Sequence, residues 1–243
     1  MKKKQIMLQG LWNEVSMGPD IRIGFLTITD FIKTNIINVP VEKYQVLKNI
    51  IFTPDMFLFP FLSSVEIKTL NQFKALKKQI EWMSGRFAVK KLVSQYCMPC
   101  DYTGITIDYE IDGAPYLKEY PDLPISISHS GGYAACALSR DRSINIGIDI
   151  EKIAPDSIKH IFKVAFTDRE QSILKRCSDA AVFESWTAKE AYLKYIKKGF
   201  NEGLKQVEVI NGGIYHHHQP VEDAALFSCR INNEYVLSLV RRT

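Results

Sequence analysis

Two carboxylates at alternate positions of a predicted strand are the side chains best placed to do chemistry. In residues 144–151 isoleucine occupies every second position, which predicts a strand whose other face carries Asn145, Gly147, Asp149 and Glu151. Residues on one strand face lie roughly 6.5–7 Å apart, so the two acids could converge on one hard cation such as Mg²⁺. Acids are also common on solvated sheet faces, and the pair alone does not define a site.

A predicted helix further along the chain offers a third carboxylate and two cations. Trp186, Glu190 and Lys194 follow one another at helical spacing, which keeps them on one face, and Lys189 flanks that stripe. A Glu–Lys pair at this spacing could instead only stabilise the helix, by roughly 0.2–0.5 kcal/mol. Taken with the strand, the helix indicates chemistry on a phosphate-bearing substrate.

Four segments, in this order, resemble the signatures of the 4′-phosphopantetheinyl transferases of the surfactin-synthetase-activating type. They are residues 85–88 (Gly-Arg-Phe-Ala), 124–131 (Pro-Ile-Ser-Ile-Ser-His-Ser-Gly), 147–151 (Gly-Ile-Asp-Ile-Glu) and 186–194, which begin Trp-Thr-Ala-Lys-Glu. The last two segments are the most specific. The resemblance runs from about residue 75 to 205, and the flanking parts of the chain match no motif.

The resemblance implies an enzyme that moves the 4′-phosphopantetheine arm of coenzyme A to a serine of an acyl or peptidyl carrier protein, releasing adenosine 3′,5′-bisphosphate. Asp149, Glu151 and Glu190 would hold Mg²⁺, or Mn²⁺ in its place, and Lys189 and Lys194 would bind the pyrophosphate. Glu190 and Lys194 are the implied catalytic residues, because the serine hydroxyl needs a base and the shifting charge needs a cation. A metal-bound water is the alternative base.

The same resemblance implies a second set of ligands for the adenosine part of coenzyme A. This set comprises Arg86, Gly113, Ala114, Ser128, His129 and Ser130. Arg86 and His129 would hold the 3′-phosphate, with one of the two serines donating to a phosphate oxygen. The turn at Gly113 and Ala114 is similar to the family's Gly-Lys-Pro segment beside the adenine, but Ala114 stands in place of the lysine and leaves only a backbone contact.

The expected fold is α+β, a pseudo-dimer of two similar lobes with the active site in the cleft between them. Residues 1–142 would form the lobe on the 3′-phosphate and adenine side, and residues 143–243 the lobe on the metal and pyrophosphate side. No run of identities between the halves shows this repeat in the sequence.

Hydrophobic periodicity and capping signals predict the individual elements. Residues 65–96 carry a helical stripe expected to loosen near Ser84 and Gly85, and Thr167 to Glu170 is a capping box that opens a helix closing near residue 177. A helix over about 180–198, capped by residues 178–179, should stop at Gly199. The predicted strands are residues 21–32 (one strand or a pair), 105–111, 133–139, 208–215, 225–231 and 235–240.

Composition is that of an ordinary globular protein. Of 243 residues, 46% are hydrophobic and 24% charged, and a net charge of +4 is too small to indicate a nucleic-acid partner, although it suits an acidic carrier protein. No signal-like segment follows Lys2 to Lys4, and the apolar stretch 56–62 is too short to span a membrane. We therefore expect a cytoplasmic protein, monomeric and without a membrane partner, whose five cysteines are free thiols.

Two clusters of side chains in the sequence, one of cysteines and one of histidines, could bind a metal. The Cys97 and Cys100 pair has redox or metal spacing but lacks a second pair. Residues 216–218 are three histidines, which could bind a metal adventitiously or simply lie on an exposed loop or strand end, and we favour the exposed position.

The alternative functions are a coenzyme A- or nucleotide-binding regulatory module without transfer activity and an Mg²⁺-dependent phosphohydrolase. Together, Asp149, Glu151, Glu190 and the two lysines favour the transferase.

Overall fold

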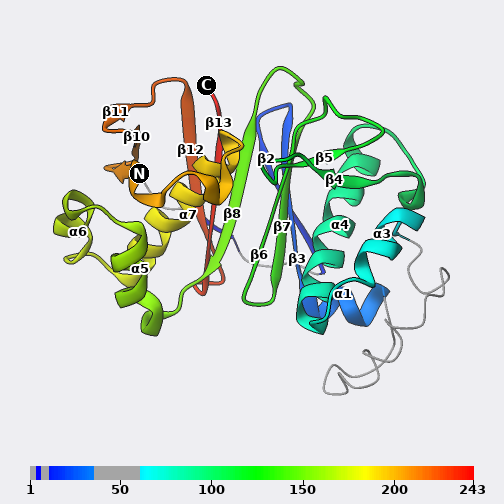
Figure 1. The fold of residues 1–243 in the computed structure, drawn as a ribbon, viewed down its shortest axis with the longest axis horizontal. Coiled ribbons are helices and arrows are strands. Elements are labelled where there is room, and N and C mark those ends of the chain that lie inside the picture. The colour runs from blue at the N-terminus through cyan, green and yellow to red at the C-terminus, as the bar shows by residue number, and fades with distance from the viewer. Residues whose placement is uncertain (1–3, 7–10, 36–60) are drawn as a thin grey trace. The chain divides into compact units, whose positions relative to one another are not determined.

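A computed structural model describes residues 4–6, 11–35 and 61–243, which form two compact units (Figure 1). The N-terminal unit comprises the described residues of 9–108 together with 115–142, and the C-terminal unit comprises residues 4–6, 109–114 and 143–243. Each unit combines helices with antiparallel strands, which confirms the predicted α+β class. Residues 2–3 of the basic start and 56–60 of the apolar stretch lie outside the described residues.

The N-terminal unit is an antiparallel sheet in the order β2-β3-β7-β6, with helix α4 packed on β7, β3 and β6. Strand β7 carries small buried side chains from Ala134 to Ala137, so the helix can approach it closely. The elements are β2 (Trp12–Met17), β3 (Ile21–Thr27), α1 (Ile28–Asn35), α3 (Ser64–Leu70), α4 (Leu76–Tyr96), η2 (Tyr102–Gly104), β4 (Ile107–Tyr109), β5 (Pro115–Leu117), β6 (Ile125–Ser130) and β7 (Tyr133–Ser139).

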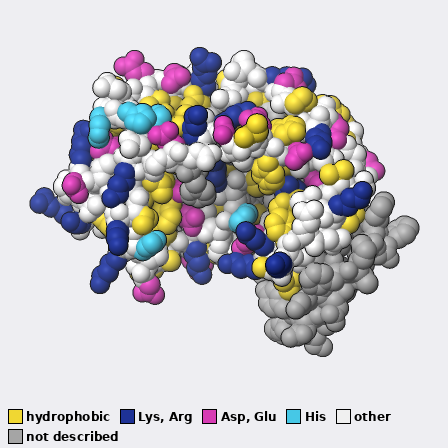
Figure 2. Space-filling model, viewed as in Figure 1, with side chains coloured by type: hydrophobic (Ala, Val, Ile, Leu, Met, Phe, Trp, Pro, Cys, Tyr) yellow, Lys and Arg dark blue, Asp and Glu magenta, His cyan; other side chains and the backbone are white. Residues whose placement is uncertain are grey.

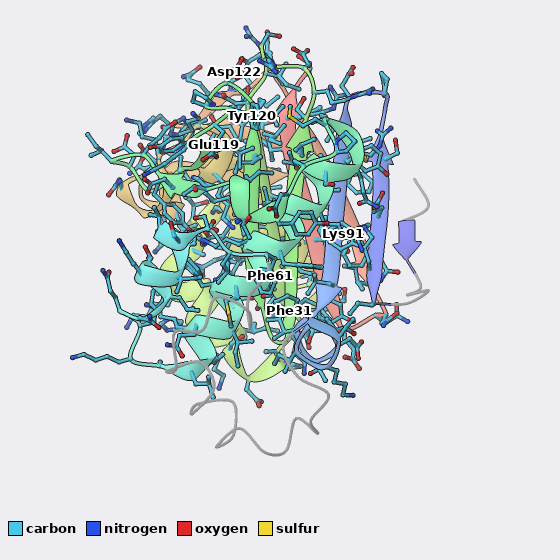
Figure 3. All side chains as sticks on the ribbon, turned by 90° about the vertical axis from the view of Figure 1, so that its right-hand side faces the viewer. Phe31, Phe61, Lys91, Glu119, Tyr120 and Asp122 are labelled. Atoms are coloured by element: carbon cyan, nitrogen blue, oxygen red, sulfur yellow. The ribbon has the colours of Figure 1, made fainter. Side chains whose placement is uncertain are left out.

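Three aromatic rings lie at the centre of this unit's core. The ring centroid of Phe31 on α1 lies 5.5 Å from that of Phe61 (Figure 3). The centroid of Phe87 on α4 lies 5.2 Å from that of Phe31 and 5.6 Å from that of Phe61. Edge-on and tilted contacts of this kind add to the stabilisation from burial alone. Phe87 belongs to the segment 85–88 that carries the family resemblance, and its side chain is therefore structural.

The C-terminal unit has a sheet in the order β1-β12-β13-β8, in which only β1 runs parallel to its neighbour, and a smaller sheet β11-β10-β9. Helix α7 packs on β8 and β13. The elements are β1 (Lys4–Ile6), β8 (Ile146–Lys152), η3 (Pro155–Ser157), α5 (Ile158–Ala165), α6 (Asp168–Leu174), α7 (Asp179–Tyr195), η4 (Gly199–Asn201), η5 (Leu204–Gln206), β9 (Val207–Ile210), β10 (Gly213–His216), β11 (Gln219–Pro220), β12 (Ala224–Ile231) and β13 (Tyr235–Arg242).

The two units share a chain path. In each, a strand leads into helices and a long helix follows. The last strand of the unit then inserts between the strand that led into the helices and the next-to-last strand, in the order β3-β7-β6 in one unit and β8-β13-β12 in the other. This is the internal similarity that the family resemblance implied and that the sequence did not display.

A buried ion pair built on a helix cap anchors the N-terminal unit. Ser63 and Glu66 form the capping box of α3, and the backbone N–H of Ser63 donates to Glu66 Oε2 at 2.8 Å. Lys90 of α4 donates to this carboxylate and, at 2.9 Å, to the carbonyl of Phe61. The backbone N–H of Ile107 donates to Glu66 Oε1 at 3.1 Å. Burial lowers the pKa of Lys90, and Glu66 opposes that shift.

The same network recurs in the C-terminal unit. Thr167 and Glu170 form the predicted capping box of α6, which the structure confirms. Lys189 of α7 donates to Glu170 Oε2 at 2.6 Å and to the carbonyl of Ala165 at 2.5 Å, and the backbone N–H of Val209 donates to Glu170 Oε1 at 2.9 Å. In both units one glutamate thus joins a short helix, the long helix and a strand.

The predicted helix over residues 65–96 is two helices, and the break lies elsewhere than expected. Residues 71–75 separate α3 from α4, where the side-chain amide of Gln79 donates to the carbonyls of Leu70 and Phe73, each at 3.2 Å. Helix α4 continues through Gly85. A Cβ built there would lie 2.9 Å from Cγ2 of Ile127, so the glycine permits close packing on β6 rather than loosening the helix.

Other element boundaries also differ. The predicted strand 21–32 ends at Thr27, whose hydroxyl accepts from the N–H of Asp30 at 3.2 Å and opens α1. The predicted strand 208–215 is the hairpin β9–β10, since Asn211 (φ 52°) and Gly212 (φ 81°) form a left-handed turn. The strand 105–111 shortens to β4, and helix α7 ends before Gly199, with Lys197 already left-handed (φ 57°). The strands 133–139, 225–231 and 235–240 are confirmed.

Candidate active site

Strand β8 presents its acids to helix α7 because a glycine lets the two backbones touch. A Cβ built on Gly147 would lie 2.0 Å from the carbonyl oxygen of Ala191 and 2.4 Å from the backbone nitrogen of Tyr195, so no other residue fits without displacing the helix. Alternation along the strand turns Asp149 and Glu151 to this same face, as predicted. The close approach places the buried Asp149 beside the helix that carries Glu190.

Asp149, Glu190 and Lys194 form one electrostatic group, which we call the acid pair and its lysine. Lys194 Nζ donates to Asp149 Oδ1 at 2.8 Å, and Trp186 Nε1 donates to Glu190 Oε1 at 3.3 Å. Burial first, and then the negative charge of Asp149, raise the pKa of Glu190 to about 7, while Lys194 and Trp186 oppose that rise. Glu190 therefore exchanges its proton near neutral pH, which is what a general base requires.

A chain of three hydroxyls, two buried (Thr187 and Ser238) and one half-buried (Ser228), connects α7 to β13 and β12 beside Asp149. Thr187 Oγ1 lies 2.7 Å from Ser238 Oγ, which lies 2.8 Å from Ser228 Oγ, and Ser238 is the residue opposite Asp149 in the pairing of β13 with β8. These positioning residues were not foreseen. Thr187 lies in the resembling segment, but no spacing in the sequence connects it to the two serines.

Lys189 does not join this group, in contrast to the predicted role in pyrophosphate binding. Its side chain is 0% exposed, its ammonium contacts Glu170 and Ala165, and it lies 4.9 Å from the ring centroid of Phe166. Burial lowers its pKa, and Glu170 opposes that shift. The physical reason is helical geometry: neighbouring residues point about 100° apart, so Lys189 faces the core while Glu190 faces Asp149.

Glu151 follows Asp149 on the same strand face and is half-buried. A different group, Glu202, His216 and His217, is the one among the described residues whose three possible metal-ligand atoms all lie within 4.8 Å of one another. Asp149, Glu151 and Glu190 are the three metal ligands implied by the resemblance, and Asp149 raises the pKa of Glu190 through its negative charge. Their metal role stays a prediction.

Arg86 occupies a different environment from the one predicted for a phosphate ligand. The residue is 2% exposed, its Nε lies 3.5 Å from Glu66 Oε1, and its Nη2 donates to the carbonyl of Ile107 at 3.3 Å. The guanidinium also lies 3.3 Å from the ring centroid of Trp82. It thus extends the buried network of Glu66, because an arginine this deep must be neutralised within the protein.

His129 lies on β6 between Ser128 and Ser130, as predicted, and remains accessible. Its side chain is 44% exposed, and its Nδ1 lies 3.7 Å from Glu81 Oε2 on α4. Ser128 is buried and Ser130 is half-buried. This strand end stays the candidate for binding a phosphate group.

Gly113 and Ala114 close the tight turn between β4 and β5. Gly113 is left-handed (φ 84°) and its N–H donates to the carbonyl of Glu110 at 2.9 Å, while the N–H of Glu110 donates to the carbonyl of Ala114 at 2.8 Å. Lys197 Nζ donates to Glu110 Oε1 at 2.8 Å, which ties the turn to the end of α7 within the C-terminal unit.

Other predicted features can be checked directly. All five cysteines are free thiols, as expected, including Cys97 and Cys100. On the face shown in Figure 2, basic side chains are interspersed with acidic ones. Within residues 4–6, 11–35 and 61–243, no helix has the length and apolar character that crossing a membrane requires.

Residues 145–240, which contain the acid pair and its lysine, match the model of the 4′-phosphopantetheinyl transferase superfamily. The resemblance predicted from the sequence is therefore confirmed.

Individual relatives agree with this match. The chain is 31% identical over 156 residues to the 4′-phosphopantetheinyl transferase HetI of a Nostoc species, covering 61% of this chain and 64% of that protein. It is 30% identical over 154 residues to the 4′-phosphopantetheinyl transferase Sfp of Bacillus subtilis, covering 61% and 66%. A further 4′-phosphopantetheinyl transferase of Bacillus subtilis is 35% identical over 113 residues, covering 45% and 49%. The match thus spans less than two thirds of each of these relatives.

Proposed function

We propose that the protein transfers the 4′-phosphopantetheine moiety of coenzyme A to a serine of an acyl or peptidyl carrier protein. The observation that carries this proposal is Glu190, a buried carboxylate with a pKa of about 7, held beside Asp149 and Lys194 in the part of the chain that matches the superfamily. A base that titrates near neutral pH suits the deprotonation of a serine hydroxyl.

The reaction forms a bond between the carrier's serine Oγ and the phosphorus of the phosphopantetheine arm. It breaks the bond from that phosphorus to the bridging oxygen of the pyrophosphate, so adenosine 3′,5′-bisphosphate leaves with the bonding electrons. Glu190 accepts the serine proton, and Lys194 offsets negative charge on the pyrophosphate. Water has to be kept from competing with the serine, which the burial of Glu190 favours.

The donor set fits a hard divalent cation. Asp149 raises the pKa of Glu190, so two carboxylates lie close enough to repel each other, and an added positive charge would relieve that repulsion. Asp149, Glu151 and Glu190 would hold Mg²⁺, or Mn²⁺, through oxygen atoms. When bound, the ion neutralises charge that develops on the pyrophosphate.

For the rest of coenzyme A we propose His129, with Ser128 or Ser130, as the contact for the 3′-phosphate, and the backbone at Gly113 and Ala114 as the border of the adenine. The exposure of His129 supports this assignment. We further propose that the protein acts as a cytoplasmic monomer, with a carrier protein as its macromolecular partner and no nucleic-acid or membrane partner. Lys189 and Arg86 have structural positions and are left out of the binding set.

The test combines the protein with coenzyme A, Mg²⁺ and a panel of apo carrier proteins, followed by mass spectrometry of the carrier. The addition of a phosphopantetheine group to the carrier serine is the expected result, and Glu190→Gln should slow it by about 10²-fold or more while Arg142→Met, on the exposed pair with Asp122, should not. Binding of coenzyme A without transfer to any carrier would favour a regulatory module. Breakdown of coenzyme A without a carrier would favour a phosphohydrolase.

A further inference from the structure

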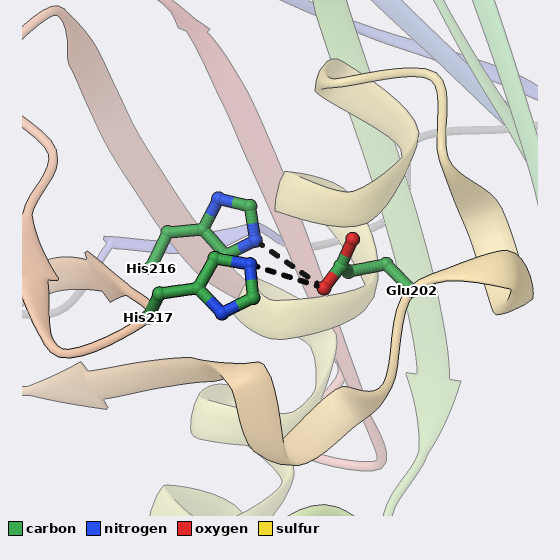
Figure 4. A group of neighbouring side chains, drawn as sticks. All are labelled: Glu202, His216 and His217. Atoms are coloured by element: carbon green, nitrogen blue, oxygen red, sulfur yellow. Dashed lines mark ion pairs between the residues drawn. The ribbon is translucent and has the colours of Figure 1, made fainter.

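A second group of metal-ligating side chains lies in the C-terminal unit, separate from the acid pair and its lysine. His216 ends strand β10 and His217 begins the left-handed turn to β11 (φ 49°). Glu202 reaches them from the segment between η4 and η5 (Figure 4). Figure 2 shows histidine side chains gathered over this hairpin. The histidine run predicted as an exposed strand end is thus at a strand end, but it meets a carboxylate.

The distances from each imidazole to the carboxylate are close to those around a small tetrahedral ion, and all three ligand atoms lie within 4.8 Å of one another. Nε2 of His216 lies 3.6 Å from Glu202 Oε1, and Nε2 of His217 lies 3.4 Å from the same oxygen. Two ligands that are each about 2.0–2.1 Å from a tetrahedral Zn²⁺ lie about 3.3–3.4 Å apart. An ion at the centre of the three atoms would therefore need little movement of the side chains.

Contacts on the far side of each imidazole hold its orientation. Nδ1 of His217 lies 3.1 Å from the amide oxygen of Gln206, which can accept a hydrogen bond from it, and Nε2 on the other side of the ring faces Glu202. Nδ1 of His216 lies 3.2 Å from the hydroxyl of Tyr192 on α7. The two rings stack with centroids 4.3 Å apart, which keeps both Nε2 atoms on one side. Metal-bound histidines characteristically have such outer partners.

The inner nitrogen of His216 is otherwise unexplained. Nε2 of His216 is buried and has no hydrogen-bond partner among the described residues, since Glu202 at 3.6 Å is beyond hydrogen-bonding distance. A buried polar atom left in this condition is costly. A metal ion would satisfy it and would also neutralise Glu202.

We propose that Glu202, His216 and His217 bind one transition-metal ion of the Zn²⁺ class, with the fourth position left to water or another small ligand. Two imidazoles and one carboxylate favour such an ion over Mg²⁺, which takes oxygen ligands. The ion would join the segment after α7 to the β10–β11 hairpin, and Tyr192 connects it to the helix of Glu190. Its role is structural support of α7, independent of the proposed transfer reaction.

The experiment is a Zn²⁺ titration of the full chain without an affinity tag, by calorimetry, with excess Mg²⁺ present to occupy oxygen-only sites. Co²⁺ in place of Zn²⁺ should give the visible absorption of a four-coordinate ion. We expect one equivalent bound, and a loss of affinity of at least tenfold in Glu202→Gln and in His217→Ala. His218→Ala is the matched control, because His218 contacts Glu208 instead, and it should change the affinity less than twofold.

Thermal unfolding provides a second test of Zn²⁺ binding that does not depend on enzyme activity. Zn²⁺ should raise the melting temperature of the wild type and of His218→Ala but not of Glu202→Gln, because a ligand that binds only the folded state stabilises it. His217 is 60% exposed, so His217→Ala should fold even if the other variant does not. The proposal is overturned if no stoichiometric Zn²⁺ binds, if Glu202→Gln binds as tightly as the wild type, or if His218→Ala weakens binding as much as His217→Ala.

Discussion

Replacing Lys189 by methionine distinguishes a structural lysine from one that binds pyrophosphate. Methionine retains the length of the apolar stem but removes the ammonium group that contacts Glu170. The side chain is fully buried, so Lys189→Met leaves an uncompensated carboxylate in the interior. Breaking a buried pair by removing one partner costs about 3–5 kcal/mol of folding free energy.

The contacts of Glu170 place the expected loss at the lower end of that range. Its carboxylate keeps two backbone donors, the N–H of Thr167 at 3.0 Å and that of Val209 at 2.9 Å, and these continue to stabilise its charge. We therefore expect a loss of about 3 kcal/mol. At about 2–4 °C per kcal/mol for a protein of this size, the melting temperature should fall by about 6–12 °C.

Urea unfolding followed by circular dichroism measures the difference in free energy directly. Arg142→Met is the control, because its pair with Asp122 is exposed on both sides and such pairs contribute about 0–1 kcal/mol. Under conditions where both variants are folded, the Michaelis constant for coenzyme A should match that of the wild type within about a factor of two.

The opposite pattern would refute this reasoning. If Lys189→Met unfolds like the wild type and its Michaelis constant for coenzyme A rises tenfold or more, Lys189 binds the pyrophosphate and the buried pair with Glu170 is not the functional arrangement.

Further predictions concern the acid pair and the packing beneath it. The transfer rate should fall by about 10²-fold or more in Glu190→Gln and should rise with pH as Glu190 loses its proton, at a pH below 7 when Mg²⁺ is bound, because the added positive charge lowers the pKa of Glu190 from its metal-free value of about 7. Trp186→Phe removes a donor to the carboxylate and should move the rise in a pH–rate profile to higher pH. The folded state holds the proton of Glu190 more tightly than the unfolded state does. The contribution of Glu190 to the free energy of unfolding should therefore fall as the pH rises from 4.5 to 7, by at most about 3 kcal/mol. Urea unfolding of Glu190→Gln should not show this pH dependence. Gly147→Ala should prevent soluble expression or lower the melting temperature sharply, because its Cβ would overlap two backbone atoms of α7. Lys90→Met should destabilise the protein less than Lys189→Met in the same urea assay, because Arg86 Nε lies 3.5 Å from Glu66 Oε1 and still compensates that carboxylate.

The centre of the candidate site could be predicted because local periodicity determines which way its side chains point. Alternation turns Gly147, Asp149 and Glu151 to one face of β8, and the interval of four residues holds Glu190 and Lys194 on one face of α7. The same geometry turns Lys189, which flanks this stripe, toward Glu170 in the core, although the resemblance implied that it binds the pyrophosphate. A sequence neighbour on a helix is not a spatial neighbour at the site.

Contacts made by residues distant in the sequence could not be predicted in this way. Arg86 lies in a segment that resembles a ligand motif, but its environment is decided by Glu66 on a separate helix. The break between α3 and α4 contains neither proline nor glycine and is held by the side chain of Gln79. By contrast, the turn at Asn211 and Gly212 could have been predicted, because Asn-Gly is a hairpin-turn sequence. The alternating apolar residues on both sides of it led to the prediction of one continuous strand.

The repeated network explains how two units can share a fold without sharing a visible sequence repeat. Two features recur: a serine or threonine three residues before a glutamate, and a buried lysine on the long helix that follows. The glutamate and the lysine are 24 residues apart in one unit and 19 in the other. Because this spacing differs, aligning the two halves of the sequence residue by residue does not bring the corresponding residues together. The residue after the buried lysine is Lys91 in the N-terminal unit and Glu190 in the C-terminal unit. The scaffold is therefore duplicated, while the base proposed for catalysis occurs in one copy, at the position where the long helix meets Asp149.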